Sequence, residues 1–390
     1  MLLFKLAFRN VIGAGLRTWL NVIVLSLSFV TIIAMQGLYK GMQYQAEDAM
    51  MQVEYAGGQY WHPAYDPYDP FTLEDSHQPV SGAAQRAVAA GDAIPILFTQ
   101  ATIYPQGRVS SALLKGIPPE QEIMEFPSEQ LLQSDHALPA IVGTRMAKSN
   151  RLAVGDYLTV RWRDANGTFD AQDVQIVHVF STIVSSVDAG QIWVPLERLQ
   201  SMLKMPNEAT LLTLRQGLTD PPVLPGWDYK GLDILMADLR EMVTSKQVGG
   251  SIMYLLLLFL ALLAIFDTQV LSIWRRKKEM GTLMAMGLTR RQLIGLFTIE
   301  GGMYGVLAAL LGALYGTPLI VWFATHGWEM PEMVDDFGFA IASKLVPSYS
   351  FFLVLGSTLL VLATVTIVSY LPTRRIAKLE PTDALRGKLT

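Results

Sequence analysis

Two carboxylates inside apolar segments are the residues of this chain best placed to do chemistry. Asp267 lies eight residues before the basic run that starts at Arg275, and Glu300 lies nine residues after Arg291. At about 1.5 Å of rise per helical residue, both carboxylates lie about 12 to 14 Å into a membrane from the same face. Charge at that depth is costly and is usually paired or functional. A proton relay is one interpretation. We favour pairing with a nearby Arg, hydroxyl or backbone group that positions the loop between them.

That loop, residues 275–291, has the pattern of a short amphipathic helix in a basic setting. Glu279 would open the helix, because a carboxylate opposes the positive end of the helix dipole. Gly287 has the usual place just after a helix C-terminus. Thr289 and Gln292 then have the spacing of a capping box, so the next apolar helix is expected to start there.

One face of this short helix is rich in methionine, since Met280, Leu283 and Met284 follow the i, i+3, i+4 spacing. Methionine side chains are adaptable, which suits docking into a groove on another protein. A basic loop that only satisfies the positive-inside rule is the simpler alternative. The candidate partner-binding residues are Glu279, Met280, Gly281, Leu283, Met284, Met286, Gly287, Arg290 and Arg291.

A second basic motif, residues 372–386, directly follows the last apolar segment. Like the first, it has the pattern of a partly helical element held against a membrane face. Its candidate residues are Arg374, Arg375, Pro381, Asp383 and Arg386.

Several classes of chemistry lack the residues they need. The chain has no cysteine, which excludes disulfides and cysteine-based metal or redox sites, and its five histidines are scattered. No sequence of the form G-x-x-x-x-G-K-[ST] occurs, so the usual phosphate-binding loop of an ATPase is absent. We therefore expect no catalytic residue, no metal site and no cofactor bound by this chain, and no nucleic-acid partner.

Composition predicts a membrane protein. Of the residues in this chain, 51% are hydrophobic and 16% are charged. In a soluble domain, about a quarter of the residues are charged. Four apolar segments reach the length of about 20 residues that spans a bilayer, and about 200 residues of ordinary globular composition separate the first two. These segments are residues 19–39, 252–274, 293–323 and 351–371.

Charge placement predicts the orientation. The N-terminal segment, the 275–291 loop and the tail together have 14 basic and three acidic residues, whereas residues 43–248 have 14 basic and 25 acidic ones. Short basic loops stay in the cytoplasm. Both termini are therefore expected inside, and the large domain outside.

The large domain is expected to be mixed α/β. Strands are predicted at 93–104 and 109–116, and a hairpin at 157–163 and 169–180 with its turn at Asn166-Gly167. Short helices are predicted at 145–151 and 196–204. In the aromatic stretch 60–79, Trp61, Tyr65 and Tyr68 suit either a partner-binding loop or packing against the domain.

The fold class expected is therefore a four-helix membrane protein with a large mixed α/β extracytoplasmic domain between helices 1 and 2. Residues 1–17 have a basic stripe typical of an interfacial helix, although an extension of the first membrane helix is an alternative. The expected organisation is an interfacial helix 1–17, membrane helix 18–42, extracytoplasmic domain 43–248, membrane helix 249–274, coupling helix 275–291, membrane helix 292–324, extracytoplasmic loop 325–348, membrane helix 349–371 and cytoplasmic tail 372–390.

The loop motif resembles a known family. The stretch EMGTLMAMG at residues 279–287, then Arg290-Arg291 and Glu300, is similar to the coupling helix of the FtsX-like permeases, also called MacB-like or type VII ABC transporter subunits. Glu300 matches the family pattern, and Asp267 does not obviously match it.

Two further stretches carry the same resemblance. PTRRIAKLEPTDALR at 372–386 resembles the family's C-terminal ending, with Asp383 where the family has Glu. GTRMAK at 143–148, followed by LAVGD at 152–156, resembles its outer-domain helix and turn. The size of the large domain is closest to the lipoprotein-releasing LolC/LolE type of subunit.

The resemblance implies a permease in the inner (cytoplasmic) membrane of a bacterium that is not itself an enzyme. It implies two ATPase subunits that bind ATP and Mg, and a second permease subunit in a homodimer or heterodimer. Membrane lipids and an extracytoplasmic adaptor or substrate carrier are further expected partners. ATP hydrolysis would change the shape of the outer domain to extract or export a lipoprotein, lipid, peptide or drug.

Two other functions stay open at this point. One is a signalling or scaffold subunit that regulates an extracytoplasmic enzyme, as in the FtsX branch of the family. The other is an unpowered channel or an anchored binding domain. Copurification of an ATPase would separate the powered permease and the signalling subunit from an unpowered channel or an anchored binding domain.

Overall fold

The computed structural model describes residues 7, 10, 15–132, 138–218, 220–329 and 344–374. The chain divides into two compact units. The helical unit comprises Met1–Met42, Met242–Trp328 and Leu345–Thr390, and the sheet unit comprises Gln43–Glu241 and Glu329–Lys344. The expected interfacial helix 1–17 lies mostly outside the described residues, as do the tail candidates Arg375, Pro381, Asp383 and Arg386.

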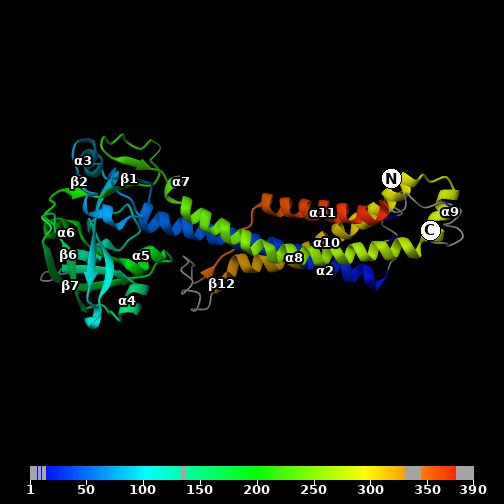
Figure 1. The fold of residues 1–390 in the computed structure, drawn as a ribbon, viewed down its shortest axis with the longest axis horizontal. Coiled ribbons are helices and arrows are strands. Elements are labelled where there is room, and N and C mark those ends of the chain that lie inside the picture. Colours follow the sequence, from blue (N-terminus) through cyan, green and yellow to red (C-terminus); the bar gives the residue numbers. More distant parts are fainter. Residues whose placement is uncertain are drawn as a thin grey trace. The chain divides into compact units, whose positions relative to one another are not determined.

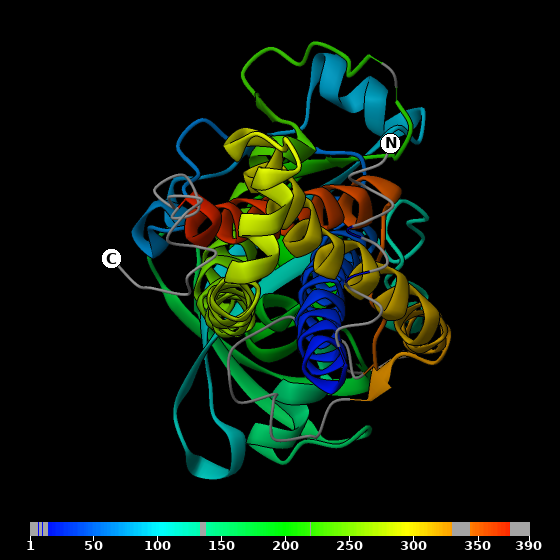
Figure 2. The ribbon, with the colours of Figure 1, turned by 90° about the vertical axis from the view of Figure 1, so that its right-hand side faces the viewer.

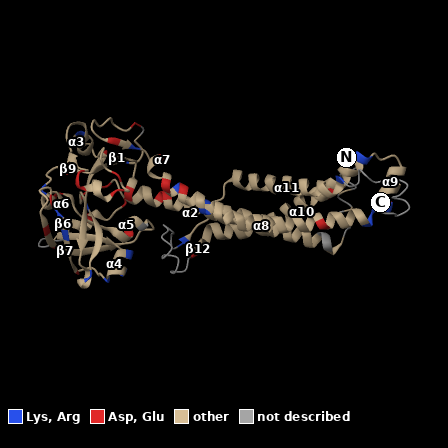
Figure 3. Cartoon of the chain, viewed as in Figure 1, with Lys and Arg blue, Asp and Glu red and all other residues tan. Residues whose placement is uncertain are grey.

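Four helices are long and apolar enough to cross a membrane, which confirms the expected number. They are almost free of charged side chains over most of their length (Figure 3). The helices are α2 (Leu16–Met50), α8 (Ala237–Arg275), α10 (Arg290–His326) and α11 (Phe351–Thr373), and the short helix α9 (Lys277–Ala285) lies between α8 and α10. Helix α8 starts earlier than the expected membrane segment and has no break near its two glycines, Gly249 and Gly250.

The long helices of the helical unit are drawn in Figures 1 and 2. Glycine allows them to pack closely. A Cβ atom on Gly316 of α10 would lie 2.7 Å from Val30 of α2, and one on Gly305 would lie 3.0 Å from Leu362 of α11. Helices α2 and α8 are linked by a hydrogen bond of 2.6 Å from the Asn21 amide to the Thr268 hydroxyl. Close approach at small residues is how helices gain dispersion contacts in a bilayer.

The sheet unit contains a closed β-barrel that the sequence pattern does not specify. Strands pair in the order β11-β1-β10-β3-β4-β8-β5-β7-β6, and β6 pairs again with β3, so the run from β3 to β6 closes on itself. The strands are β1 (Gln59–Trp61), β2 (Gln78–Pro79), β3 (Ala93–Ile103), β4 (Ser110–Ile117), β5 (Leu138–Gly143), β6 (Tyr157–Arg163), β7 (Phe169–Phe180), β8 (Gln191–Pro195), β9 (Glu208–Ala209), β10 (Leu211–Leu214) and β11 (Asp228–Lys230).

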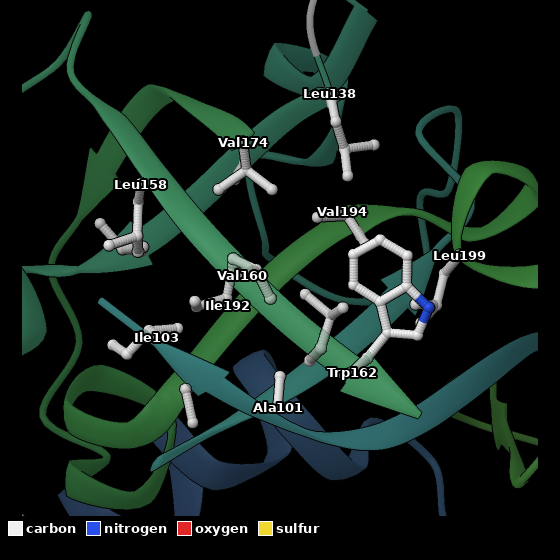
Figure 4. Close-up of a cluster of buried hydrophobic side chains, with 14 of the residues drawn as sticks. Ala101, Ile103, Leu138, Leu158, Val160, Trp162, Val174, Ile192, Val194 and Leu199 are labelled. Carbon is white, nitrogen blue, oxygen red and sulfur yellow. The ribbon is translucent and has the colours of Figure 1, made fainter. Parts of the chain in front are cut away.

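Alternation along the strands fills the barrel with apolar side chains. On β6, for example, Leu158, Val160 and Trp162 are buried inside, while Tyr157 and the two arginines of the strand are exposed. Figure 4 shows these side chains meeting Val174 of β7 in the same cluster. This dry core gives the unit the stability that buried apolar area provides.

The helices of the sheet unit are short. They are α3 (Gly82–Ala89), α4 (Thr144–Asn150), α5 (Ser185–Gly190), α6 (Leu196–Leu203) and α7 (Leu232–Leu235), with a π-turn η1 at Met51–Tyr55 and 3-10 turns η2 (Pro70–Glu74), η3 (Pro105–Gly107) and η4 (Ser128–Leu132). A two-residue pair, β12 (Trp328–Glu329) and β13 (Lys344–Leu345), flanks residues 330–343. The predicted strands at 93–104 and 109–116, the predicted hairpin and both predicted helices are confirmed.

Candidate functional site

The segment from Arg275 to Gln292 folds as its sequence predicts. Helix α9 follows α8 almost directly, and Gly287 after it has φ +100°, a conformation that glycine adopts without strain. Thr289 and Gln292 form the expected capping box. The backbone N–H of Gln292 donates to Thr289 Oγ1 at 3.3 Å, and the backbone N–H of Thr289 donates to Gln292 Oε1 at 2.9 Å. The position at which α10 starts is therefore defined by its own side chains.

Arg276, in the cap position before α9, joins the two carboxylates of this region. Its Nε and Nη2 donate to Glu279 at 2.7 and 2.8 Å, and its Nη1 donates to the Glu300 oxygens at 2.8 and 3.1 Å. The planar guanidinium therefore uses both edges, one for the helix that it caps and one for α10. Such two-pronged pairing fixes geometry in a way that a lysine would not reproduce.

Glu300 is held from a second side by the N-terminal segment. Asn10 Nδ2 donates to Glu300 Oε1 at 2.6 Å, across 290 positions of sequence. The Glu300 side chain is only 6% exposed, and the Arg276 guanidinium lies 4.9 Å from the centre of the Phe297 ring. One buried carboxylate thus connects the N-terminal segment, the residue that caps α9 and helix α10.

The two ends of this network differ in solvent exposure. Glu279 is 52% exposed, and its hydrogen bonds to Arg276 lower the pKa of its carboxyl below the ordinary value. The same hydrogen bonds are the main reason that the pKa of Arg276 is raised, so its charge is permanent. An exposed pair of this kind contributes about 0 to 1 kcal/mol, whereas the buried Glu300 depends on its partners.

The methionine face of α9 points inward. Met280 is fully buried against Ile273 and Phe297, and Leu283 and Met284 pack at the edge of the same cluster. The three residues share one face as predicted, but this face meets the chain's own α8 and α10. In this conformation Met280 is therefore not accessible to a partner and instead holds α9 against α8 and α10. Docking of the methionine face into a groove on a partner stays a prediction.

The side chains left for a partner lie on the opposite face of α9 and in the turn after it. Met286 is the large apolar side chain of this surface and is 68% exposed. Glu279 and Gly287 are exposed beside it, whereas Gly281 is buried. The other exposed side chains of this surface are Lys278, Thr282, Ala285, Thr289, Arg290 and Arg291. We call this set, with Glu279, Met286 and Gly287, the α9 outer face.

The remaining candidates are more isolated. Asp267 is exposed on α8 and makes no hydrogen bond or ion pair with any part of the chain that the structure describes, so the pairing expected for it is not found there. Arg374 lies directly after α11, with its guanidinium 5.9 Å from the Tyr370 ring. Neither residue joins the Arg276 network.

Two members of the network were not among the sequence candidates. Arg276 counts in the sequence only as part of a basic run, although its spacing of three from Glu279 is a signal for pairing on one helical turn. Asn10 gives no local signal at all, because its partner is 290 positions away.

Comparison with known proteins confirms the resemblance seen in the sequence. Residues 251–381 match the family model described as FtsX-like permease C-terminal. The lipoprotein-releasing system transmembrane protein LolC of Neisseria meningitidis serogroup B is 20% identical over 332 residues, which cover 75% of this chain and 77% of that protein. LolC of Xylella fastidiosa is 19% identical over 407 residues, covering 94% of this chain and 92% of that protein.

A third relative matches a shorter stretch. The pyoverdine export ATP-binding/permease protein PvdT of Pseudomonas fluorescens is 26% identical over 155 residues, covering 40% of this chain and 21% of that protein. With four apolar helices and permeases as relatives, this chain is a multi-pass membrane protein.

Proposed function

With an FtsX-like permease region at residues 251–381, we propose that this chain is the membrane subunit of an ABC transporter driven by a separate ATPase at the α9 outer face. The observation that carries the proposal is the construction of α9. Its apolar face is sealed against α8 and α10, while Met286 is left exposed. Met286 would supply the buried apolar contact of a docking site, and the polar and basic side chains around it would form the rim.

The Arg276 network gives a route for movement from this surface. A partner that displaces α9 also displaces Arg276, which holds Glu300 of α10 and, through it, Asn10. Packed elements with paired charges move as units rather than deform continuously. We infer that two ATPase subunits act on two permease subunits in this way, and that the sheet unit responds.

Substrate and orientation belong to the same proposal. The basic loop and tail support an orientation with the α9 outer face in the cytoplasm and the acidic sheet unit outside a bacterial inner membrane. Two of the relatives are lipoprotein-releasing proteins, and a lipoprotein or another lipid-linked molecule is accordingly the substrate class that we favour. Work on such a substrate at the outer surface needs no pore through the helices.

The test is copurification of a nucleotide-hydrolysing subunit with the tagged chain from its native membrane. We expect wild type to retain ATPase activity and Met286→Asp to lose most of it, at an unchanged thermal midpoint. Val223→Asp is the matched control, because Val223 is 87% exposed in the sheet unit.

Equal ATPase recovery from the Met286 and Val223 variants would remove α9 as the docking element. If no ATPase activity copurifies with the wild-type chain, the proposal of an ATP-driven transporter fails, and an anchored binding domain becomes the better account. Recovery of ATPase together with a bound external hydrolase would favour the signalling alternative.

A further inference from the structure

A cavity of about 540 Å³ lies within the sheet unit, outside the barrel. Its wall includes the outward faces of β3, β4 and β8, which carry Phe98, Lys115 and Trp193. Its other sides are residues 54 and 55, the loop 61–68, strand β11 and residues 234–238. The volume suits a small organic molecule or a few side chains of a peptide.

The aromatic stretch of the sequence forms one side of this cavity. Trp61 and Tyr65 meet edge to face with ring centres 5.0 Å apart, and Tyr65 meets Phe98 in the same way at 5.7 Å. Tyr68, also in the lining, is 74% exposed. Trp61 and Tyr65 therefore pack against the domain, which was one of the two alternatives for them, and with Tyr68 they line a cavity.

The wall of the cavity contains one buried cation among aromatic rings. Lys115 is 3% exposed, and its ammonium lies 4.6 Å from the Phe98 ring centre and 4.8 Å from that of Trp193. Glu54 neutralises it at 3.0 Å. Electron-rich ring faces attract cations, and the attraction is larger where water is excluded.

The remaining charge of the lining is negative. Beyond the Lys115–Glu54 pair, the lining has the carboxylates Asp66, Asp228 and Asp238 against one ammonium, Lys230, which lies 5.6 Å from the Trp61 ring. Burial lowers the pKa of His62, which keeps that ring neutral. Burial is the main cause that raises the pKa of the Tyr65 hydroxyl, and the nearby carboxylates Glu54 and Asp66 raise it further.

We propose that this cavity binds an organic cation, an ammonium or guanidinium group attached to an apolar body. The aromatic rings would contact the apolar body and the cation, and Asp228 and Asp238 would balance the charge. A basic peptide segment would offer both the cation and the apolar body.

The position of the cavity gives such a ligand mechanical consequences. Glu54 and Tyr55 lie in η1, directly after α2, and Asp238 lies in the first turn of α8. A bound ligand would therefore contact the sheet unit's connections to both helices. The proposal goes beyond transport by an ATPase, and its test needs no ATPase.

The experiment is a titration of the purified full chain in lipid nanodiscs with rhodamine 6G, followed by fluorescence anisotropy. Rhodamine 6G is an aromatic cation, and fluorescein is an anion with the same xanthene ring system. Because rhodamine 6G also partitions into lipid, the specific fraction is the part displaced by excess tetraphenylphosphonium. Thermal unfolding midpoints show whether each variant is folded.

We expect saturable, displaceable binding of rhodamine 6G by wild type, and none of fluorescein. The double variant Asp228→Asn with Asp238→Asn should raise the Kd about tenfold or more. Trp61→Leu should also weaken binding, through loss of the ring face. Glu122→Gln, which removes an exposed carboxylate outside the cavity lining, should leave the Kd unchanged.

Three results would overturn the proposal. These are no displaceable binding to wild type, equal binding of fluorescein, or an unchanged Kd in a folded Asp228/Asp238 double variant.

Discussion

Arg276 and Glu300 form a pair in which one guanidinium nitrogen reaches both carboxylate oxygens, at 2.8 and 3.1 Å. They are 24 positions apart in the sequence, one before α9 and one after it. Any displacement of α9 must therefore either carry α10 with it or break this pair.

The Arg276–Glu300 pair should contribute more to the free energy of unfolding than an exposed ion pair does. Arg276→Met leaves Glu300 buried without its cation, and loss of one partner from a buried pair costs about 3 to 5 kcal/mol. Glu300→Leu should show a similar loss, and the double variant should lose less than the sum of the two. Thermal unfolding of the three variants in detergent measures this coupling. Arg291→Gln, an exposed position in the same loop, is the control; strictly additive losses would mean that the pair does not act as a unit.

The Glu279 carboxylate predicts a pH dependence. Its pKa is lowered in the folded chain, so the Arg276–Glu279 pair stabilises fully above the ordinary glutamate value of 4.5 and is lost as pH falls below it. Glu279→Gln should therefore be slightly less stable than wild type at pH 7, by about 1 kcal/mol or less because the side chain is half exposed. The two unfolding midpoints should converge as the pH falls through the lowered pKa of Glu279, and a gap that widens on acidification would contradict the pairing.

Two glycines of α10 offer a matched test of helix contact. A Cβ on Gly301 would lie 2.2 Å from Ser369 Oγ, whereas one on Gly295 would meet nothing within 4 Å. Gly301→Ala should lower stability because α11 must move. Gly295→Ala should be neutral or stabilising by up to about 1 kcal/mol, since alanine is the better helix former. The measurement is the thermal unfolding midpoint of each variant. Equal midpoints would show that α11 does not pack at Gly301.

Orientation can be tested cleanly because the chain has no cysteine of its own. Met286→Cys and Val223→Cys each introduce one thiol at a position that is more than half exposed. A membrane-impermeant maleimide added to intact cells, with the outer membrane permeabilised if there is one, should label position 223 and not position 286. Labelling of both should require disruption of the inner membrane. The reverse pattern would place α9 outside and overturn the proposed ATPase contact.

Local patterns in the sequence predict local structure well. The hairpin strands at 157–163 and 169–180 agree with β6 and β7 at every boundary, since alternation and an Asn-Gly turn specify them. The capping box at Thr289 is equally local. Such features depend on neighbours within a few residues, and a single sequence contains that information.

Long-range partners are not specified in this way. Ala101 pairs with Trp162 where β3 meets β6 and closes the barrel, but either strand alone has only an apolar face. The sequence likewise indicates on which face of α9 Met280 lies, but it does not indicate whether that face packs against the chain itself or against a partner. Asn10 has no pattern that points to Glu300, because the pairing depends on how the whole helical unit packs.

Barrel closure also limits how the sheet unit can bind extended peptide. A peptide that adds as a strand needs an edge with unpaired backbone groups. In the main sheet of the described residues, β11 is the one strand with a single neighbour, and its ends, Asp228 and Lys230, also line the cavity. An added strand would thus find a whole open edge of only three residues on this sheet, which leaves little template for self-association.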